Sequence, residues 1–415
     1  MRVETFGSAR NGNRDFQRLW VGQAVSQLGS SISMVGLQFT AVATLNATPR
    51  QMGLLAAAGG ITILTVGLFA GALADRTRRR PILISVDVAR AVVLATIPVM
   101  AWLGRLTMNH LYVFAALTGA LTVMFDSAYR AYLPVVVTED ELLSSNSKLA
   151  LSQSASEVAG PGLAGVLIQL FGAPLAILLD SVSFLWSAVW LASIRIREPA
   201  PMAGAEGSHV LLEIEDGLKA AWKQPILRAL ALRNATGAFF LGFIGGMYFL
   251  FVVRELGLGA GLVGTIISFG GAFSLAGSAA AQRLAARFGM GRAMIGAALA
   301  TGLGSLLPGL AHGPVWVCVA FLAASQMFDI GWSVYGIGEA TLIQSIAPPH
   351  LLGRVSAAVS LLFRGVIPIG SVVAGLLAER ISLRGAMLVG GAGYLLSAGW
   401  LVRCRELQQW RHASS

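Results

Sequence analysis

The sequence has little charge and almost no cysteine. Only 12% of its 415 residues are charged, and 55% are hydrophobic, whereas a soluble domain carries about a quarter charged residues. We therefore expect the chain to be surrounded by lipid. Cys318 and Cys404 stand far apart, so the sequence offers no disulfide framework and no cysteine metal site. The first dozen residues are polar and no cleavage-like site follows them, so no removable signal peptide is expected.

Long apolar runs fill most of the sequence. A membrane-spanning helix needs about 20 apolar residues, and the runs provide roughly a dozen of that length. The Thr138-Glu139-Asp140-Glu141 run is interpreted as a turn between two of them. The predicted spans are 16–45, 51–75, 81–104, 111–137, 147–171, 174–194, 226–253, 261–286, 293–311, 315–345, 353–378 and 385–403.

One long polar connection, residues 195–225, interrupts the series of spans. Within it, apolar residues from Val210 to Trp222 recur at helical spacing, which predicts an amphipathic helix on the inner membrane face. The net charge of +10 could point to nucleic acid. Because most arginines lie in short loops between spans, the charge instead indicates orientation in a cell membrane, with both termini cytoplasmic.

The two halves of the chain repeat one another. Three short sequence motifs recur in the same order at equivalent spans. This repeat predicts two six-helix bundles related by a parallel repeat, with a cavity between them. We predict an N-terminal bundle over 1–194, a cytoplasmic linker over 195–225 and a C-terminal bundle over 226–415. The repeated motifs are Met124-Phe125-Asp126 with Met327-Phe328-Asp329, Leu73-Ala74-x-Arg76 with Leu284-Ala285-x-Arg287, and Gly160 followed by Ala164-Gly165 with Gly370 followed by Ala374-Gly375.

The densest block of charge, Gly71 to Arg80, joins two apolar runs. With its glycine, Asp-Arg pair and basic run, the block resembles the loop 2–3 signature of the major facilitator superfamily. The Gly160-Pro161-x-x-Ala164-Gly165 run resembles that family's antiporter signature. The resemblance covers essentially the whole chain. It implies an all-α membrane protein with 12 transmembrane helices in two six-helix bundles.

Several stretches resemble more narrowly the drug:proton antiporter branch, which includes macrolide efflux proteins and the enterobactin exporter. They include Ser26-Gln27-Leu28-Gly29, Tyr132-Leu133-Pro134 and Asp180-x-x-Ser183-Phe184. Two positions depart from the pattern. Ser30 stands where branch members often carry an acidic residue, and Ala286 stands in the second half where Asp75 stands in the first.

The resemblance implies roles for two groups of residues. Asp75 would hold the cytoplasmic side closed through a contact near the start of the eleventh span, because a helix N-terminus attracts a carboxylate. The conformational latch would comprise Gly71, Asp75, Arg76, Arg79, Arg80, Arg354 and Arg364. Small residues would let the fifth span bend as a hinge; these are Gly160, Pro161 and Gly165.

Four carboxylates within spans are candidates for proton coupling, because a charge at the bilayer centre costs about 2.5–3.5 kcal/mol. Asp126 and Asp329 lie near the middle of their spans. Arg130 is one helical turn from Asp126, so a structural ion pair is an equal alternative there. Asp329 has no basic residue within a turn and is favoured. Glu157 and Glu339 are weaker candidates, since either could simply form hydrogen bonds between helices.

In the superfamily, spans 1, 4, 7 and 10 line the cavity, and polar or aromatic faces fall on these spans here. An apolar, aromatic cavity with scattered amides suits an amphiphilic organic substrate. For each aromatic residue alone, core packing or lipid contact is the simpler interpretation, and for the glutamines it is hydrogen bonding between helices. The candidate cavity residues are Gln23, Gln27, Met34, Gln38, Thr122, Tyr129, Phe240, Phe243, Met247, Gln326 and Trp332.

These features favour a proton-driven exporter of small amphiphilic molecules that works by alternating access. We expect a small-molecule substrate, protons and the lipid bilayer as partners, no cofactor beyond the proton gradient, no metal, no nucleic acid and a monomer. An importer or uncoupled facilitator stays open because Ser30 replaces an acid. A polytopic membrane enzyme is the alternative of another class, but the sequence contains no nucleophile motif, metal cluster or phosphate-binding loop.

Overall fold

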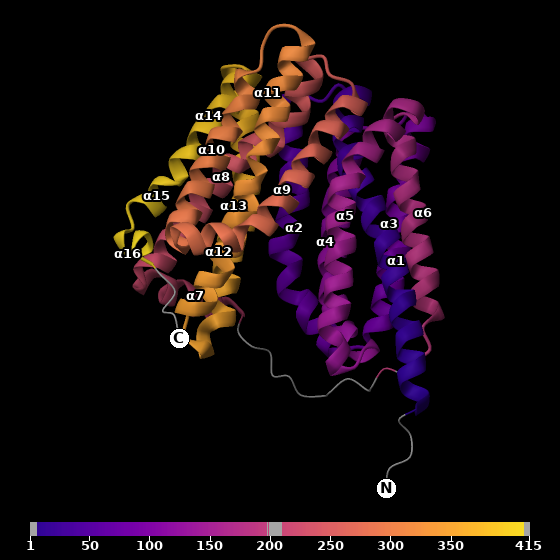
Figure 1. Ribbon diagram of the computed structural model, residues 1–415. Coiled ribbons are helices and arrows are strands. Elements are labelled where there is room, and N and C mark those ends of the chain that lie inside the picture. The colour runs from indigo at the N-terminus through magenta and orange to yellow at the C-terminus, as the bar shows by residue number, and fades with distance from the viewer. Residues whose placement is uncertain (1–5, 197, 199–209, 411–415) are drawn as a thin grey trace. The chain divides into compact units, whose positions relative to one another are not determined.

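The computed structural model describes residues 6–196, 198 and 210–410, except for the side chains of residues 6–13, 63, 64, 67–76 and 210–214. Almost all of the described chain is helical (Figure 1). The first six long helices are α1 Phe6–Phe39, α2 Pro49–Arg76, α3 Arg79–Trp102, α4 Met108–Val136, α5 Glu139–Phe171 and α6 Ala173–Ser193. A π-helical turn, Thr40–Thr44, extends α1.

The polar connection contains one helix, α7 Val210–Lys223, as the sequence predicts. The later helices are α8 Pro225–Arg254, α9 Ala260–Phe288, α10 Met290–Leu310, α11 Val315–Met327, α12 Asp329–Ile346, α13 Leu352–Arg380 and α14 Leu383–Ser397. Two four-residue helices follow, α15 Gly399–Val402 and α16 Arg405–Gln408, and a 3₁₀ turn at Pro349–Leu351 precedes α13.

Nine helices in the described part of the chain are long and apolar enough to cross a membrane. In that set α11 and α12 form one span, and α14 and α15 another. Together with α1, α2 and α5 this gives the twelve spans of the predicted fold. Helices α1 and α5 fall outside the apolar set because polar residues are spread along them.

Local chemistry places several helix ends. Thr138 and Glu141 form a reciprocal capping box, so the acidic run is the first turn of α5 and not the turn between spans that the sequence suggested. Carboxylates in a first turn also interact favourably with the helix dipole. Gly172 and Gly289 adopt positive φ values of 83° and 84° where α5 meets α6 and α9 meets α10, conformations that favour glycine.

The chain divides into two compact units, one of residues 1–45 and 62–207 and one of residues 46–61 and 208–415. The first part of α2 thus groups with the second unit, where Gly53 packs on the backbone of Ser371. The boundaries expected at 194 and 226 stay predictions.

Equivalent helix pairs recur in the two units. In the first unit α1 packs on α5 and α6, and α3 packs on α4 and α6. In the second unit α8 packs on α13 and α14, and α10 packs on α12 and α14. When the spans are numbered within each half, these are the same four pairs, which agrees with the repeat found in the sequence.

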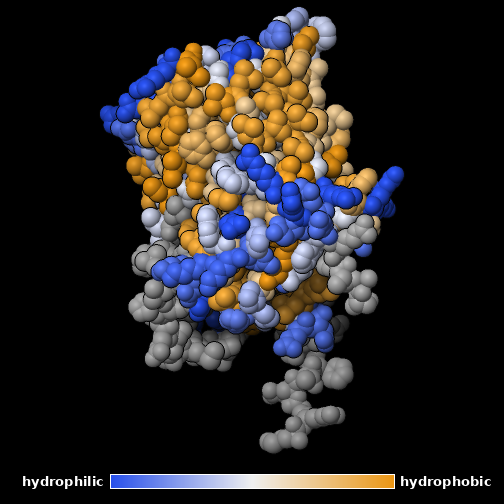
Figure 2. Space-filling view, turned by 90° about the vertical axis from the view of Figure 1, so that its left-hand side faces the viewer, coloured by the Kyte–Doolittle hydropathy of each residue, from blue (hydrophilic) through white to orange (hydrophobic). Residues whose placement is uncertain are grey.

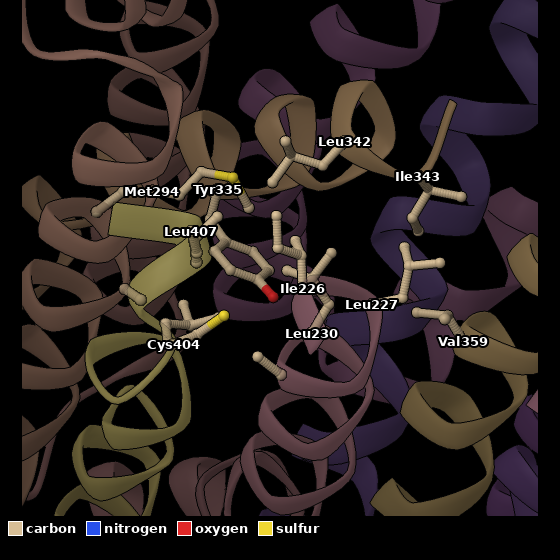
Figure 3. Close-up of a cluster of buried hydrophobic side chains, with 14 of the residues drawn as sticks. Ile226, Leu227, Leu230, Met294, Tyr335, Leu342, Ile343, Val359, Cys404 and Leu407 are labelled. Carbon is tan, nitrogen blue, oxygen red and sulfur yellow. The ribbon is translucent and has the colours of Figure 1, made fainter. Parts of the chain in front are cut away.

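Each unit has its own apolar core. In the second unit Tyr335, Leu230 and Met294 are buried among residues of α8, α10, α12 and α16 (Figure 3). In the first unit Leu19, Leu83 and Tyr132 occupy the same kind of position. Apolar side chains also cover much of the surface: Figure 2 shows a broad hydrophobic region above a mostly hydrophilic one. Exposed residues such as Leu303 and Leu396 suit contact with lipid.

Glycine allows α13 and α8 to approach closely. A Cβ atom on Gly370 would lie 1.9 Å from the carbonyl oxygen of Phe239, so Gly370→Ala should force the helices apart. Overpacking of this kind costs about 1–3 kcal/mol, and we expect a matching loss in the free energy of unfolding, measured by denaturation in detergent. Gly353→Ala on the same helix is the control, because a Cβ atom there meets nothing within 4 Å. Equal stability of the two variants would contradict the expectation.

Candidate transport site

The tenth span is broken at the residues that repeat in the sequence. Helix α11 ends at Met327 and α12 begins at Asp329, with Phe328 between them. The sequence predicted one continuous span here. The break places Asp329 in the first turn of α12, where the helix dipole favours a carboxylate. In transporters, half-helix ends of this kind form binding sites for ions and substrates.

Two polar side chains from the break converge on α9. A Cβ atom built on Gly270 would lie 2.0 Å from Oε1 of Gln326 and 2.6 Å from Oδ2 of Asp329. A larger residue at position 270 would force at least one of these side chains to move. The hydroxyl of Tyr248 is buried, lies within electrostatic reach of Asp329 and has no hydrogen-bond partner in the described part of the chain. Polar groups of the tenth span, Gln326 and Asp329, thus lie near a buried hydroxyl of α8, that of Tyr248.

A second polar cluster, in the first unit, was missed by the sequence analysis. The guanidinium of Arg90 lies between two aromatic rings, 4.7 Å from the centroid of Phe125 and 5.0 Å from that of Phe184. It donates to Oδ1 of Asp87 at 3.4 Å and to the carbonyl of Leu121 at 3.3 Å. Asp87 and Arg90 are 0% and 5% exposed. Their spacing of three residues within an apolar span could have revealed them.

Asp180 of α6 belongs to this cluster. It is 2% exposed, and its Oδ1 accepts a hydrogen bond of 2.9 Å from the hydroxyl of Ser183. The same carboxylate faces α1, where it would lie 2.5 Å from a Cβ atom on Gly29. Arg90 is within electrostatic reach of both Asp180 and Asp126. One cation thus serves several carboxylates, which makes the cluster sensitive to the loss of Arg90.

A third network joins three helices of the second unit. Arg233 of α8 donates to the hydroxyl of Tyr394 at 3.0 Å, and its guanidinium lies 3.9 Å from the ring centroid of Tyr335. Tyr335 donates to Asn234 at 3.2 Å, and Asn234 donates to Glu339. Glu339 is therefore held by a hydrogen bond between helices, which was the alternative to its role in proton coupling.

Two of the remaining three acidic candidates, Glu157 and Asp126, are exposed. Glu157 accepts a hydrogen bond of 3.0 Å from Gln153, one turn earlier on α5. Asp126 and Arg130 both lie on α4, and both side chains are exposed. Asp329 is half-buried, so it is the candidate carboxylate that combines partial burial with a helix break.

The candidate cavity residues occupy different environments. Phe243 and Met247 are buried in the core of the second unit, and Gln23 is buried and donates to Ser187 of α6 at 3.4 Å. These placements match the simpler interpretations of core packing and hydrogen bonding between helices. Half-buried side chains are Gln27, Gln38, Tyr129, Phe240 and Gln326, and exposed ones are Met34, Thr122 and Trp332.

Part of the latch is described. The side chains of Asp75 and Arg76 and the surroundings of Gly71 are not described. The contact expected for Asp75 therefore stays a prediction. Arg354 forms an ion pair of 3.0 Å with Asp216 of α7, and Arg364 is exposed.

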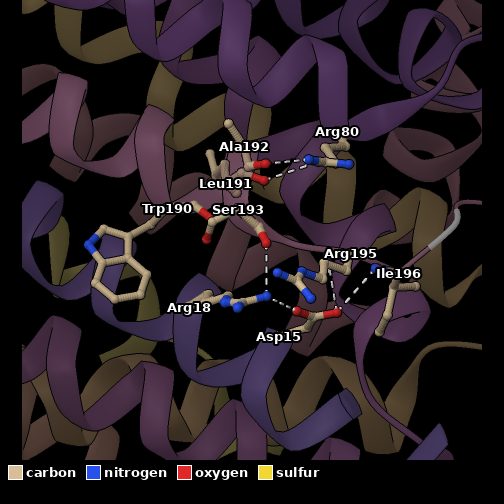
Figure 4. A network of polar contacts seen from close by, with 9 residues as sticks. All are labelled: Asp15, Arg18, Arg80, Trp190, Leu191, Ala192, Ser193, Arg195 and Ile196. Carbon is tan, nitrogen blue, oxygen red and sulfur yellow. Dashed lines mark hydrogen bonds and ion pairs between the residues drawn. The ribbon is translucent and has the colours of Figure 1, made fainter.

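Arg79 and Arg80 bind the end of the first bundle. Their backbone N–H groups donate to the carboxylate of Glu198 at 2.7 and 3.2 Å, which caps the start of α3. The Arg80 side chain donates to the carbonyls of Leu191 and Ala192 at the end of α6 (Figure 4). These arginines therefore have a structural role beside the orienting role that the sequence predicts.

The segment after α6 is fastened to α1 as well. Asp15 accepts hydrogen bonds from the backbone of Arg195 and Ile196 at 3.2 and 3.1 Å (Figure 4). Arg18 pairs with Asp15 at 2.7 Å and also donates to the carbonyl of Ser193.

The predicted hinge residues lie in a continuous α5. Gly160 packs on α1, where its Cβ atom would lie 2.3 Å from that of Ser31, and Gly165 is buried. Pro161 lies inside the helix without ending it.

Comparison with known proteins decides the family. The model of the Major Facilitator Superfamily matches residues 19–370. The chain belongs to this superfamily. It is therefore a multi-pass membrane transporter rather than an enzyme, as the sequence predicted.

Curated relatives of this superfamily member include efflux proteins. This chain is 28% identical over 395 residues to the multidrug efflux pump Tap of Mycolicibacterium fortuitum. The match covers 91% of this chain and 93% of the relative. The chain is 22% identical to macrolide efflux protein A of Streptococcus pyogenes, covering 92% and 93%. The resemblance to the efflux branch is thereby confirmed.

Solved structures of the superfamily share the fold. The crystal structure of the nucleoside transporter NupG has a TM-score of 0.76 at 12% identity, covering 96% of this chain and 100% of that one. A bacterial homologue of the iron transporter ferroportin, in an inward-facing state, has a TM-score of 0.75 at 18% identity, covering 96% and 99%. At these identities the likeness concerns the fold alone.

Proposed function

We propose that this transporter exports small amphiphilic organic molecules in exchange for protons by alternating access. The similarity to named efflux proteins over nine-tenths of the chain supports the direction and the substrate class. The observation that carries proton coupling is the group at the break of the tenth span. There Asp329 and Gln326 point at Gly270, and an intramembrane carboxylate is by default a functional residue.

Everted membrane vesicles that contain the protein provide the test. With an acidic interior, they should accumulate a lipophilic cationic dye, and collapse of the pH gradient by nigericin should release it. Vesicles without the protein are the control. Accumulation that is independent of the pH gradient would contradict proton coupling but would leave transport intact.

An uncoupled facilitator is the second candidate. It is supported by Ser30, which stands where related exporters often carry an acidic residue in the first span. Such a protein would equilibrate the dye across the membrane at any pH and would never concentrate it. The vesicle assay therefore separates the two candidates.

A further inference from the structure

The loop between α9 and α10 adjoins a basic cavity in the second unit. The cavity has a volume of about 790 Å³, and its lining includes Arg287, Arg292 and Gln282. No carboxylate belongs to the described lining, and neither arginine forms an ion pair with a described residue. The sequence gives the reason, because Ala286 stands where the first half carries Asp75. The cavity therefore has room for an anion beside Arg287 and Arg292.

The start of α10 adds backbone donors to the same cavity. Gly289, at a φ of 84°, turns the chain directly into α10, and Met290 and Arg292 of its first turn line the cavity. The first N–H groups of a helix lack partners within the helix, and together with the helix dipole they attract phosphate. Arginine adds the planar donor pair that matches phosphate oxygens.

An apolar groove continues from this cavity along α10. It has a volume of about 480 Å³ and shares Phe288, Arg292 and Val334 with the basic cavity. Small residues form its floor at one-turn intervals, from Ala293 through Gly296 to Ala300. The helix rises by about 10 Å between residues 293 and 300. The lining of the groove also includes Phe328, in the break of the tenth span.

We propose that this combined site binds an anionic phospholipid. The phosphate would lie between Arg287, Arg292 and the start of α10, and one acyl chain would fill the groove as far as Phe328. A soluble anion would use the basic cavity alone, whereas a phospholipid would also explain the apolar groove that adjoins it. The arginine distribution predicts that the site faces the inner leaflet, where anionic lipids attract basic residues.

Native mass spectrometry of the full-length protein in detergent tests the proposal. Phosphatidylglycerol and phosphatidylcholine with identical acyl chains are titrated separately, and the first binding event is compared. Wild-type protein should prefer phosphatidylglycerol. Arg287→Gln with Arg292→Gln should weaken phosphatidylglycerol binding about 30-fold, at about 1 kcal/mol for each arginine. Arg403→Gln with Arg405→Gln removes two exposed arginines outside the site and should leave binding unchanged.

The groove is tested independently of the charge. Gly296→Leu should fill it without a clash, because a Cβ atom there meets nothing within 4 Å, and phosphatidylglycerol should then bind more weakly. Gly245→Leu is the control, at a position equally open but outside the groove. If the glutamine double variant fails to fold, the double variant with lysine at Arg287 and Arg292 takes its place. It keeps both charges and should retain the preference for phosphatidylglycerol.

Three results would overturn the proposal. Equal affinity of wild-type protein for both lipids would remove the charge recognition. An undiminished preference for phosphatidylglycerol in the glutamine double variant would place the recognition elsewhere. Displacement of the lipid by millimolar sn-glycerol 3-phosphate would show a site for soluble anions instead.

Discussion

Asp329→Asn should reduce proton-driven efflux to the level of vesicles that lack the protein. The amide has the shape of the carboxyl group but cannot bind and release a proton near neutral pH. Its position in the first turn of α12 means that the lost charge also removes an interaction with the helix dipole worth about 0.3–1 kcal/mol. The protein should therefore stay folded while coupling is lost.

Two measurements separate coupling from binding in this variant. Accumulation of dye driven by a pH gradient should disappear, whereas exchange of labelled for unlabelled dye without a gradient should continue. Asp140→Asn, in the exposed first turn of α5, is the matched control and should behave as wild type. Full gradient-driven accumulation by the Asp329 variant would exclude it from proton coupling and would favour Asp126.

The sequence predicted the fold because lipid imposes simple rules on it. Apolar runs of span length, the arginine bias and the repeated Met-Phe-Asp word were sufficient to predict two similar halves, and equivalent helix pairs are indeed formed in both units. The same reasoning could not find the break at Phe328. Asp329 follows Phe328 directly, but residues 315–346 as a whole are apolar enough for one span. Hydropathy averaged over a span does not distinguish one continuous helix from two half-helices.

The candidate site was predicted only in part, because the sequence does not show in which direction each side chain points. Gln326 and Asp329 were named from their type and span, and the structure brings them together at Gly270. Phe243 and Met247 were named in the same way, but they point into the core. Asp87 and Arg90 were missed because they lie on α3, outside the spans that line the cavity in the superfamily, and their spacing of three residues was not taken as a sign of pairing. Periodicity gives the face of a helix but not the neighbour that the face meets.

Arg90→Met should destabilise the protein more than any other substitution considered for the first unit. The methionine fills most of the space between Phe125 and Phe184, so the main loss is the charge itself. Asp87 and Asp180 are 0% and 2% exposed, and they would then lack their shared cation. Removing one partner of a buried ion pair costs about 3–5 kcal/mol. Thermal unfolding in detergent should show this loss, while Arg105→Met at an exposed position should not.

A compensating variant distinguishes lost charge balance from lost packing. When Asp87→Asn and Asp180→Asn accompany Arg90→Met, neither buried position carries a charge, so the cost of an unpaired buried charge is removed. Most of the unfolding free energy should therefore return. If the triple variant is as unstable as Arg90→Met alone, the charge balance is not the main source of stability. The guanidinium would then act mainly through its contacts with the two rings and the carbonyl of Leu121.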